Sequence, residues 1–207
     1  DGSDMQNTNL SGASFIQVDF TKIKNKSLAG SDLTTASFAH SNLSGVNLSG
    51  VVLHENNFNK TDLSGVDFTA ISSASIKGTA FGQANLSNSN FEGVDISATE
   101  TFSIVFENEA HIKNLDEAVE LLTKLAEERG LGWLSEHIHI ISTEVRGNDL
   151  VVYYIFFNSF AHANLENANL KNADLGITNL YSANLTNADL SGADLRNAYL
   201  GNVDLSN

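Results

Sequence analysis

The stretch from Phe160 to Asn207 reads FAHANLENANLKNADLGITNLYSANLTNADLSGADLRNAYLGNVDLSN and repeats one five-residue phrase without interruption. A large apolar residue stands at every fifth position, from Phe160 to Leu205. Two places before it the residue is usually Ala, and one place before it the residue is usually Asn or Asp. A period of five matches neither the 3.6 of an α-helix nor the 2 of a flat strand, so it predicts a solenoid.

The repeat determines which side chains lie inside. The large residue points into the shaft of the solenoid. The residue two places before it also points inward and must be small, because a narrow shaft has room for one large group on each side. The Asn or Asp between them is expected to face outward near the bend, where a short polar side chain hydrogen-bonds the backbone and tolerates unusual φ/ψ. Four phrases then complete a square coil, and successive coils pair at about 4.8 Å.

Phrases such as Ala163-Asn164-Leu165, Ala168-Asn169-Leu170 and Ala173-Asp174-Leu175 give a pattern that resembles the pentapeptide-repeat family. The resemblance covers residues 8–97 and 158–207. It implies an all-β fold, a right-handed quadrilateral parallel β-helix, interrupted here by a small β-α-β-β insert. We therefore expect a first β-helical part at 8–97, an inserted α+β module at 98–158 and a second β-helical part at 159–207.

Two steps in the register, Phe20–Leu28 and Phe68–Ile76, are three residues too long. Either each is a bulge within one repeat, or Ile23 and Ile71 are additional core positions. The phenylalanines favour bulges. If each long step, and the interruption Ile96–Phe160, counts as a single step, five phenylalanines fall on one wall of the shaft, where their rings would stack. This structural core column consists of Phe15, Phe38, Phe58, Phe81 and Phe160. The same count predicts 27 repeats in about seven coils.

Residues 98–158 follow a different pattern. Phe102, Ile104 and Phe106 alternate with polar residues, which predicts a strand. Residues 114–130 carry an N-cap signature, helical spacing and a closing glycine. Residues 137–145 and 149–157 read as two strands around a turn. The strand order 1-3-2 would bring both ends of the module together, so that the solenoid could resume. One helix covers one face of this sheet, so we expect the solenoid or another subunit to cover the second face.

Composition limits the classes of function. The chain has 207 residues without cysteine, which excludes disulfides and thiolate metal sites. It has no proline, which suits a ladder in which almost every N–H donates. No apolar run is long enough to span a bilayer. The repeats begin within a few residues of Met5, which leaves no room for a signal peptide, so a cytoplasmic protein is expected.

Three histidines of the insert, His111, His137 and His139, are the nearest approach to a metal site. Their spacing matches no metal motif, and alternating polar positions on a half-exposed strand explain them better. A metal-dependent site on the insert is therefore a remote alternative. We expect no enzyme activity, no metal and no cofactor.

The formal net charge is −14, which disfavours binding to nucleic acid. Some members of the family that protect DNA gyrase imitate the shape and charge of duplex DNA, so the resemblance implies a DNA mimic as an alternative. The repeats carry 14 acidic and 7 basic residues, and the insert carries 11 and 4. This moderate density, the basic cluster Lys22, Lys24 and Lys26, and the size of the insert all count against mimicry.

The preferred hypothesis is a non-enzymatic scaffold, a rigid repeat rod that presents the inserted module to a protein partner. Both ends of a β-helix expose unpaired backbone groups, and neither terminus shows a capping helix. Either the ends stack on another chain, or this chain is part of a longer one. We therefore expect a homodimer through a coil end or the insert, with no membrane contact. The candidate contact residues are the insert aromatics Trp133, Tyr153 and Tyr154.

Overall fold

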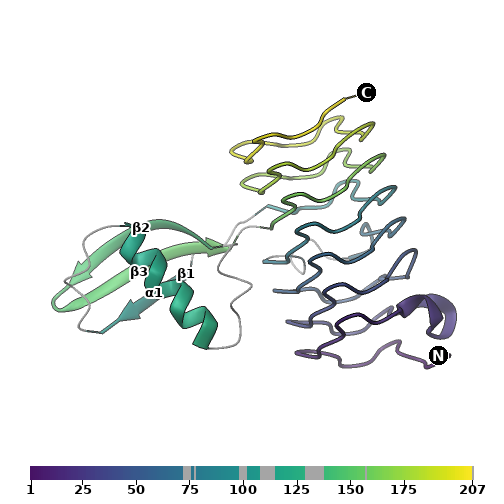
Figure 1. Ribbon diagram of the computed structural model, residues 1–207, viewed down its shortest axis with the longest axis horizontal. Coiled ribbons are helices and arrows are strands. Elements are labelled where there is room, and N and C mark those ends of the chain that lie inside the picture. The colour runs from purple at the N-terminus through teal and green to yellow at the C-terminus, as the bar shows by residue number, and fades with distance from the viewer. Residues whose placement is uncertain are drawn as a thin grey trace. The chain divides into compact units, whose positions relative to one another are not determined.

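The computed structural model describes residues 1–71, 76, 78–97, 102–107, 115–128, 138–156 and 158–206. The chain divides into two compact units (Figure 1). The repeat unit comprises Asp1–Ser97 and Asn158–Asn207, and the inserted unit is Ala98–Phe157. The sequence placed residue 158 in the insert. Asn158 belongs to the repeat unit because its side chain is buried in the shaft.

The repeat unit is a stack of coils joined by parallel β-bridges. Ser37 pairs with Asn57 and Asn164 pairs with Asn184, so one coil contains 20 residues, or four repeats. Each pair is held from both sides: Phe38 N donates to Asn57 O at 2.8 Å, and Asn57 N donates to Ala36 O at 3.2 Å. The bridges form one column on each of four walls, so the solenoid is a quadrilateral parallel β-helix.

The winding continues through all three interruptions. Asn9 pairs with Asp32 and Asn57 with Ala80, so each bulge adds three residues to a coil, and Ala80 pairs with Ser159 across the inserted unit. The first bulge contains two short 3-10 turns, η1 (Phe20–Lys22) and η2 (Lys24–Lys26). Ile71 at the second bulge is nevertheless 4% exposed and packs in the core. The bulge interpretation thus gives the right winding, while this isoleucine also serves as a core residue.

The Asn or Asp of each repeat has a different role from the expected one. Its backbone makes the inter-coil bridge and is therefore extended, as at Asp32. Its side chain binds two residues ahead: Asp32 Oδ1 accepts from Thr34 N at 3.0 Å. The left-handed conformation falls one residue later still, at Thr35 with φ 56°. The expectation that the Asn or Asp itself adopts unusual φ/ψ is therefore wrong.

The inward phenylalanines of one wall form a continuous stack. Ring centroids lie 5.3 Å apart for Phe15–Phe38, 5.1 Å for Phe38–Phe58, 5.5 Å for Phe58–Phe81 and 4.8 Å for Phe81–Phe160. This is the arrangement that the register count predicts. The last pair spans the insertion, so the stack crosses the site where the inserted unit leaves.

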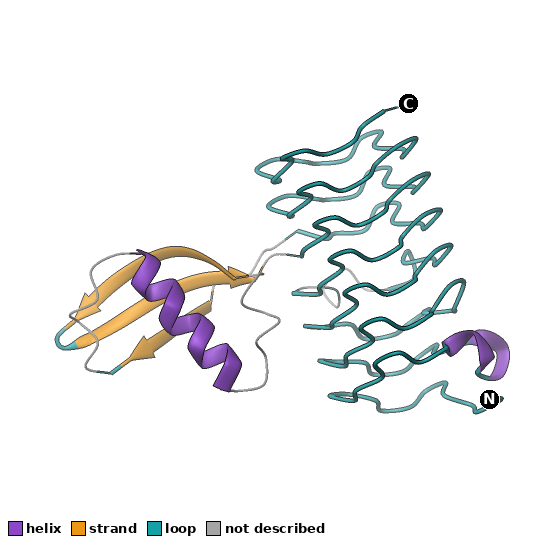
Figure 2. Ribbon diagram, viewed as in Figure 1, coloured by secondary structure: helices purple, strands orange, loops and turns teal. Residues whose placement is uncertain are grey.

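The inserted unit contains β1 (Phe102–Phe106), α1 (Leu115–Glu128), β2 (Ile138–Arg146) and β3 (Asp149–Phe156). The sheet has the order β1-β3-β2 with both pairs antiparallel, which confirms the predicted order (Figure 2). The helix packs on one face, through a small core of Ala118, Leu122, Leu150 and Val152. The predicted caps, Asn114 and Gly130, lie outside the described residues. No helix in the described ranges has the length and apolar character needed to cross a bilayer.

Candidate interaction surfaces

The contact residues predicted from the sequence belong to the inserted unit. Tyr153 and Tyr154 lie on β3, the central strand, where Tyr154 pairs with Phe102 on one side and Ile140 on the other. The two tyrosines therefore have sheet neighbours on both sides of their backbone. Trp133 lies outside the described residues, as do the side chains of both tyrosines.

The two faces of the inserted sheet differ in cover. Leu150 and Val152 lie beneath α1, and their neighbour Val151 alternates to the other face, where it is also buried. Val105 stands beside Val151 in the register and is 53% exposed. The face away from the helix therefore carries at least one large apolar side chain in contact with solvent, on an edge strand.

The structure does not bring the predicted histidines together. His111 and His137 lie outside the described residues, and His139 lies on β2. Among the residues that are described, no group of three or more His, Cys, Asp or Glu side chains is placed to hold a metal ion. The described part of the chain thus offers no metal centre.

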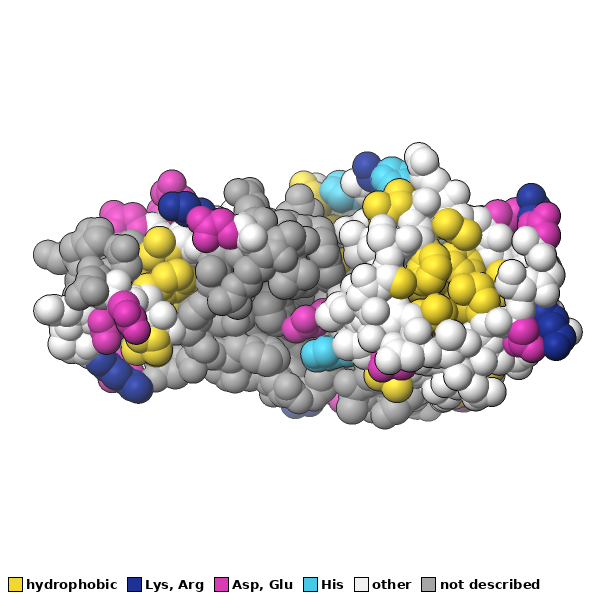
Figure 3. Space-filling view, turned by 90° about the horizontal axis from the view of Figure 1, so that it is seen from below, with side chains coloured by type: hydrophobic (Ala, Val, Ile, Leu, Met, Phe, Trp, Pro, Cys, Tyr) yellow, Lys and Arg dark blue, Asp and Glu magenta, His cyan; other side chains and the backbone are white. Residues whose placement is uncertain are grey.

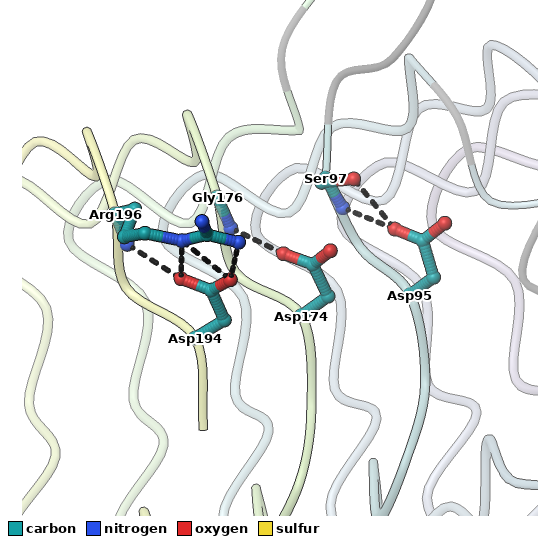
Figure 4. A network of polar contacts seen from close by, with 6 residues as sticks. All are labelled: Asp95, Ser97, Asp174, Gly176, Asp194 and Arg196. Carbon is teal, nitrogen blue, oxygen red and sulfur yellow. Dashed lines mark hydrogen bonds and ion pairs between the residues drawn. The ribbon is translucent and has the colours of Figure 1, made fainter. Parts of the chain in front are cut away.

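Three aspartates form a column on one wall of the repeat unit, with Asp95 paired to Asp174 and Asp174 to Asp194 (Figure 4). Each binds the backbone N–H two residues ahead, at Ser97, Gly176 and Arg196. Arg196 Nε also donates to Asp194 Oδ2 at 2.8 Å. These bonds, the one from the Arg196 side chain first, lower the pKa of Asp194 to about 2. The column therefore stabilises the bends of the solenoid.

The predicted basic cluster is neutralised by nearby carboxylates. Lys24 Nζ lies 2.8 Å from Asp4 Oδ2, and Lys22 Nζ lies 3.4 Å from Asp19 Oδ2. The hydrogen bond between Lys24 and Asp4 raises the pKa of the lysine and lowers the pKa of the aspartate. This cluster therefore fixes the first bulge to its neighbours.

The N-terminal end of the shaft is open. A hollow of about 320 Å³ lies there, lined mainly by the apolar side chains of Met5, Phe15, Val18, Phe20 and Ile23. Figure 3, which views the molecule from below, shows apolar side chains gathered on this face of the repeat unit. Phe15 is half-buried, whereas the other rings of its column are fully buried. The stack of rings therefore ends at a surface.

A pair of exposed tyrosines, missed in the sequence, lies near the C-terminal end of the repeat unit. The rings of Tyr181 and Tyr199 stack with centroids 5.7 Å apart at 17°, and His162 meets Tyr181 edge-on at 5.5 Å. Asn202 Nδ2 donates to the Tyr181 hydroxyl at 3.1 Å. A Cβ atom on Gly201 would come within 2.9 Å of the Tyr181 ring, so this glycine leaves space for it. Tyr199 is 60% exposed, at a repeat position that usually holds Asn or Asp.

Comparison with solved structures identifies chains of similar repeats. HetL, a pentapeptide-repeat protein involved in heterocyst differentiation regulation from the cyanobacterium Nostoc sp., is 20% identical with a TM-score of 0.44. The match covers 96% of this chain and 62% of HetL, so this chain spans less than two thirds of that protein.

Two further matches are Rfr23 from the cyanobacterium Cyanothece and QnrB1, a plasmid-mediated fluoroquinolone resistance protein. Rfr23 is 17% identical, covering 96% of this chain and 88% of that one, with a TM-score of 0.25. QnrB1 is 14% identical, covering 100% and 85%, with a TM-score of 0.29. A search of curated proteins found no match.

The family model for pentapeptide repeats matches in eight copies, at residues 1–24, 31–69, 159–197 and 178–207. These segments make up more than half of the chain and lie wholly within the repeat unit. The chain therefore belongs to the pentapeptide-repeat family, whose fold is the right-handed quadrilateral β-helix.

Proposed function

We propose that this protein is a non-enzymatic binding protein in which the repeat unit is a rigid carrier and the inserted unit contacts a protein partner. The observation that supports this most directly is the unbroken register around the insertion. Phe81 N donates to Ser159 O at 2.7 Å, and Asp95 pairs with Asp174. A 60-residue unit, Ala98–Phe157, is thus accommodated without any change in the coils on either side.

The inserted sheet supports the choice of this unit as the contact module. Its central strand carries Tyr153 and Tyr154, and aromatic residues are enriched where protein interfaces gain most of their binding energy. Val105 exposes an apolar side chain on the face away from α1. Association through this unit would also account for the homodimer expected from the sequence.

The alternative is a duplex-DNA mimic that binds a type II topoisomerase. Mimicry requires an extended array of unpaired carboxylates. In the repeat unit the acidic column of Asp95, Asp174 and Asp194 is engaged in turn hydrogen bonds, and Arg196 neutralises its last member. A metal-dependent site on the insert is a more remote alternative, tested by metal analysis of the protein and of His137→Ala.

A capture experiment distinguishes these possibilities. The full chain, a variant with residues 98–157 replaced by a short Gly/Ser linker, and a Lys171→Glu variant altered only on the repeat surface are immobilised in parallel. We expect a partner to bind the full chain and Lys171→Glu equally and to be lost with the linker variant. A partner retained by the linker variant would contradict the proposal. Inhibition of DNA supercoiling by the full chain would support the mimic instead.

A further inference from the structure

Acidic residues are distributed unevenly over the four walls of the repeat unit. The phenylalanine wall is defined here as the wall from which Phe15, Phe38, Phe58, Phe81 and Phe160 point inward. The other three walls and their corners carry Asp19, Asp32, Glu55, Asp62, Asp67, Glu92, Asp95, Glu166, Asp174, Asp189, Asp194 and Asp204. The outward positions of the phenylalanine wall and of the corner that follows it all lie within the described residues, and none of them is acidic.

The corner that follows this wall instead carries basic and amide side chains in one column. His40 N donates to Asn59 O, Lys60 N to Gly82 O, and Gln83 N to Ala161 O, so these residues and His162 occupy successive coils about 4.8 Å apart. All four have left-handed backbones and exposed side chains. His40, Lys60 and His162 therefore form a basic ridge on a strongly acidic protein.

The acidic residues nearest to the ridge in sequence face the next wall and are already engaged. Asp62 follows Lys60 by two positions, and its Oδ1 accepts from Ser64 N at 3.0 Å and from Asn85 Nδ2 at 3.1 Å. Because charges more than about 8 Å away are screened at physiological ionic strength, the local ridge rather than the net charge governs contact at this corner.

The ridge continues into the tyrosine pair. His162 is both the last basic residue of the column and the ring that meets Tyr181 edge-on. Tyr199 stands on the phenylalanine wall at the position that is Ser14, Ser37 and Ser159 in other coils. The middle of that wall is closed, since Ala80 and Ser159 are buried, so the accessible part is the corner itself. The corner surface is defined as His40, Lys60, Gln83, His162, Tyr181 and Tyr199.

We propose that the corner surface binds an extended, acidic segment of a partner protein, with its carboxylates along the ridge and an aromatic or apolar side chain against Tyr181 and Tyr199. Tyrosine set among Ser, Asn, Gln and Gly, without carboxylates, is the composition of protein-binding surfaces. Nucleic acid is a poorer fit, because one lysine provides too few phosphate contacts. This surface lies on the repeat unit and is separate from the contact proposed for the inserted unit.

The length of the surface defines the probe. From His40 to the coil of Tyr199 the column rises through five coil steps, or about 24 Å. An extended peptide of about eight residues spans this length. The probe is a fluorescein-labelled peptide of about eight residues that alternates Glu and Tyr, and its counterpart alternates Lys and Tyr. Binding to the full chain is followed by fluorescence anisotropy at low and at physiological salt.

Variants are chosen from residues that the same columns already accept. Lys60→Gln repeats Gln83, and Tyr199→Ser repeats Ser159, so both are compatible with the coil. Lys60→Glu reverses the charge of the ridge, and Lys171→Glu makes the same change in net charge on another wall. Circular dichroism establishes that each variant is folded.

We expect saturable binding of the Glu/Tyr peptide that weakens about tenfold in Lys60→Glu and in Tyr199→Ser, and less in Lys60→Gln. Lys171→Glu should bind as the unaltered chain does, and the Lys/Tyr peptide should not bind the corner. Equal loss in Lys60→Glu and Lys171→Glu would show a net-charge effect and overturn the proposal. Failure of the unaltered chain to bind the acidic peptide, or tighter binding of an oligothymidine probe, would overturn it as well.

Discussion

The side-chain amide of Asn158 donates a hydrogen bond to the carbonyl of Ile96, which joins the first residue after the inserted unit to the last large core residue before it. The Oδ1 atom of the same amide accepts from Thr79 N at 3.0 Å, in the preceding coil. Asn158 is 1% exposed and stands where most repeats have Ala. One buried side chain therefore closes the gap in the solenoid from which the inserted unit leaves.

Asn158→Ala should lower the free energy of unfolding by about 2 to 3 kcal/mol. The substitution leaves the buried Ile96 carbonyl and the Thr79 N–H without these partners, and each such loss is costly. Urea unfolding measures the change, and faster hydrogen exchange of the Thr79 amide localises it. Thr178→Ala is the matched control, because its buried hydroxyl makes no hydrogen bond with the described residues and its removal should cost about 1 kcal/mol or less. Equal costs for both variants would contradict the clamp.

The sequence predicts the features that repeat and misses those that depend on one coil meeting the next. The spacing of five assigns Phe58 and Phe81 to one wall, and the hydrophobic pattern predicts the order β1-β3-β2. Asn158 reads as an imperfect repeat, since nothing local shows that its partners are Ile96 and Thr79. Tyr181 and Tyr199 occupy different repeat positions, so their stacking requires the three-dimensional bend.

Phe58→Leu should destabilise the repeat unit by about 1 to 3 kcal/mol. The ring of Phe58 is stacked on both sides, at 5.1 Å from Phe38 and 5.5 Å from Phe81, and leucine leaves a cavity and loses both aromatic contacts. Thermal and urea unfolding measure the loss. Phe15→Leu is the control in the same column: Phe15 is half-buried at the open end, so the cost should be clearly smaller. The reverse order of costs would argue against a closed stack.

The carboxyl of Asp194 should titrate near pH 2 in the folded protein. The hydrogen bond from the Arg196 side chain lowers its pKa from 3.8 to about 2. Because the pKa is lower in the folded chain, this group contributes stability above pH 3.8, and the contribution is lost as the pH falls toward 2. Carboxyl chemical shifts followed by NMR measure the value. Arg196→Gln should return the pKa toward 3.8, and an unchanged pKa would show that the arginine is not its cause.

Ile177→Asn should stabilise the protein by about 1 kcal/mol. Ile177 holds a β-branched side chain in the left-handed region, at φ 56°, a conformation that asparagine adopts at lower cost. The equivalent residue of the next coil is Asn197, with φ 61°. The control is Ile16→Asn, which removes an exposed isoleucine outside the left-handed region and should leave the melting temperature unchanged. A similar gain in both variants would point to surface polarity as the cause.

Replacing residues 98–157 by a short glycine linker should leave a cooperatively folded repeat unit. The bond from Asn158 to Ile96 places the two ends of the excised segment close together, and the bridge between Asp95 and Asp174 lies entirely outside it. We expect the β-helical circular dichroism spectrum and a single unfolding transition to persist. Deleting only Ala163 and Asn164 is the control, because a change of two residues shifts every later side chain out of register and should abolish the transition. If excision of the insert is as damaging as this small deletion, the repeat unit does not fold independently of the inserted one.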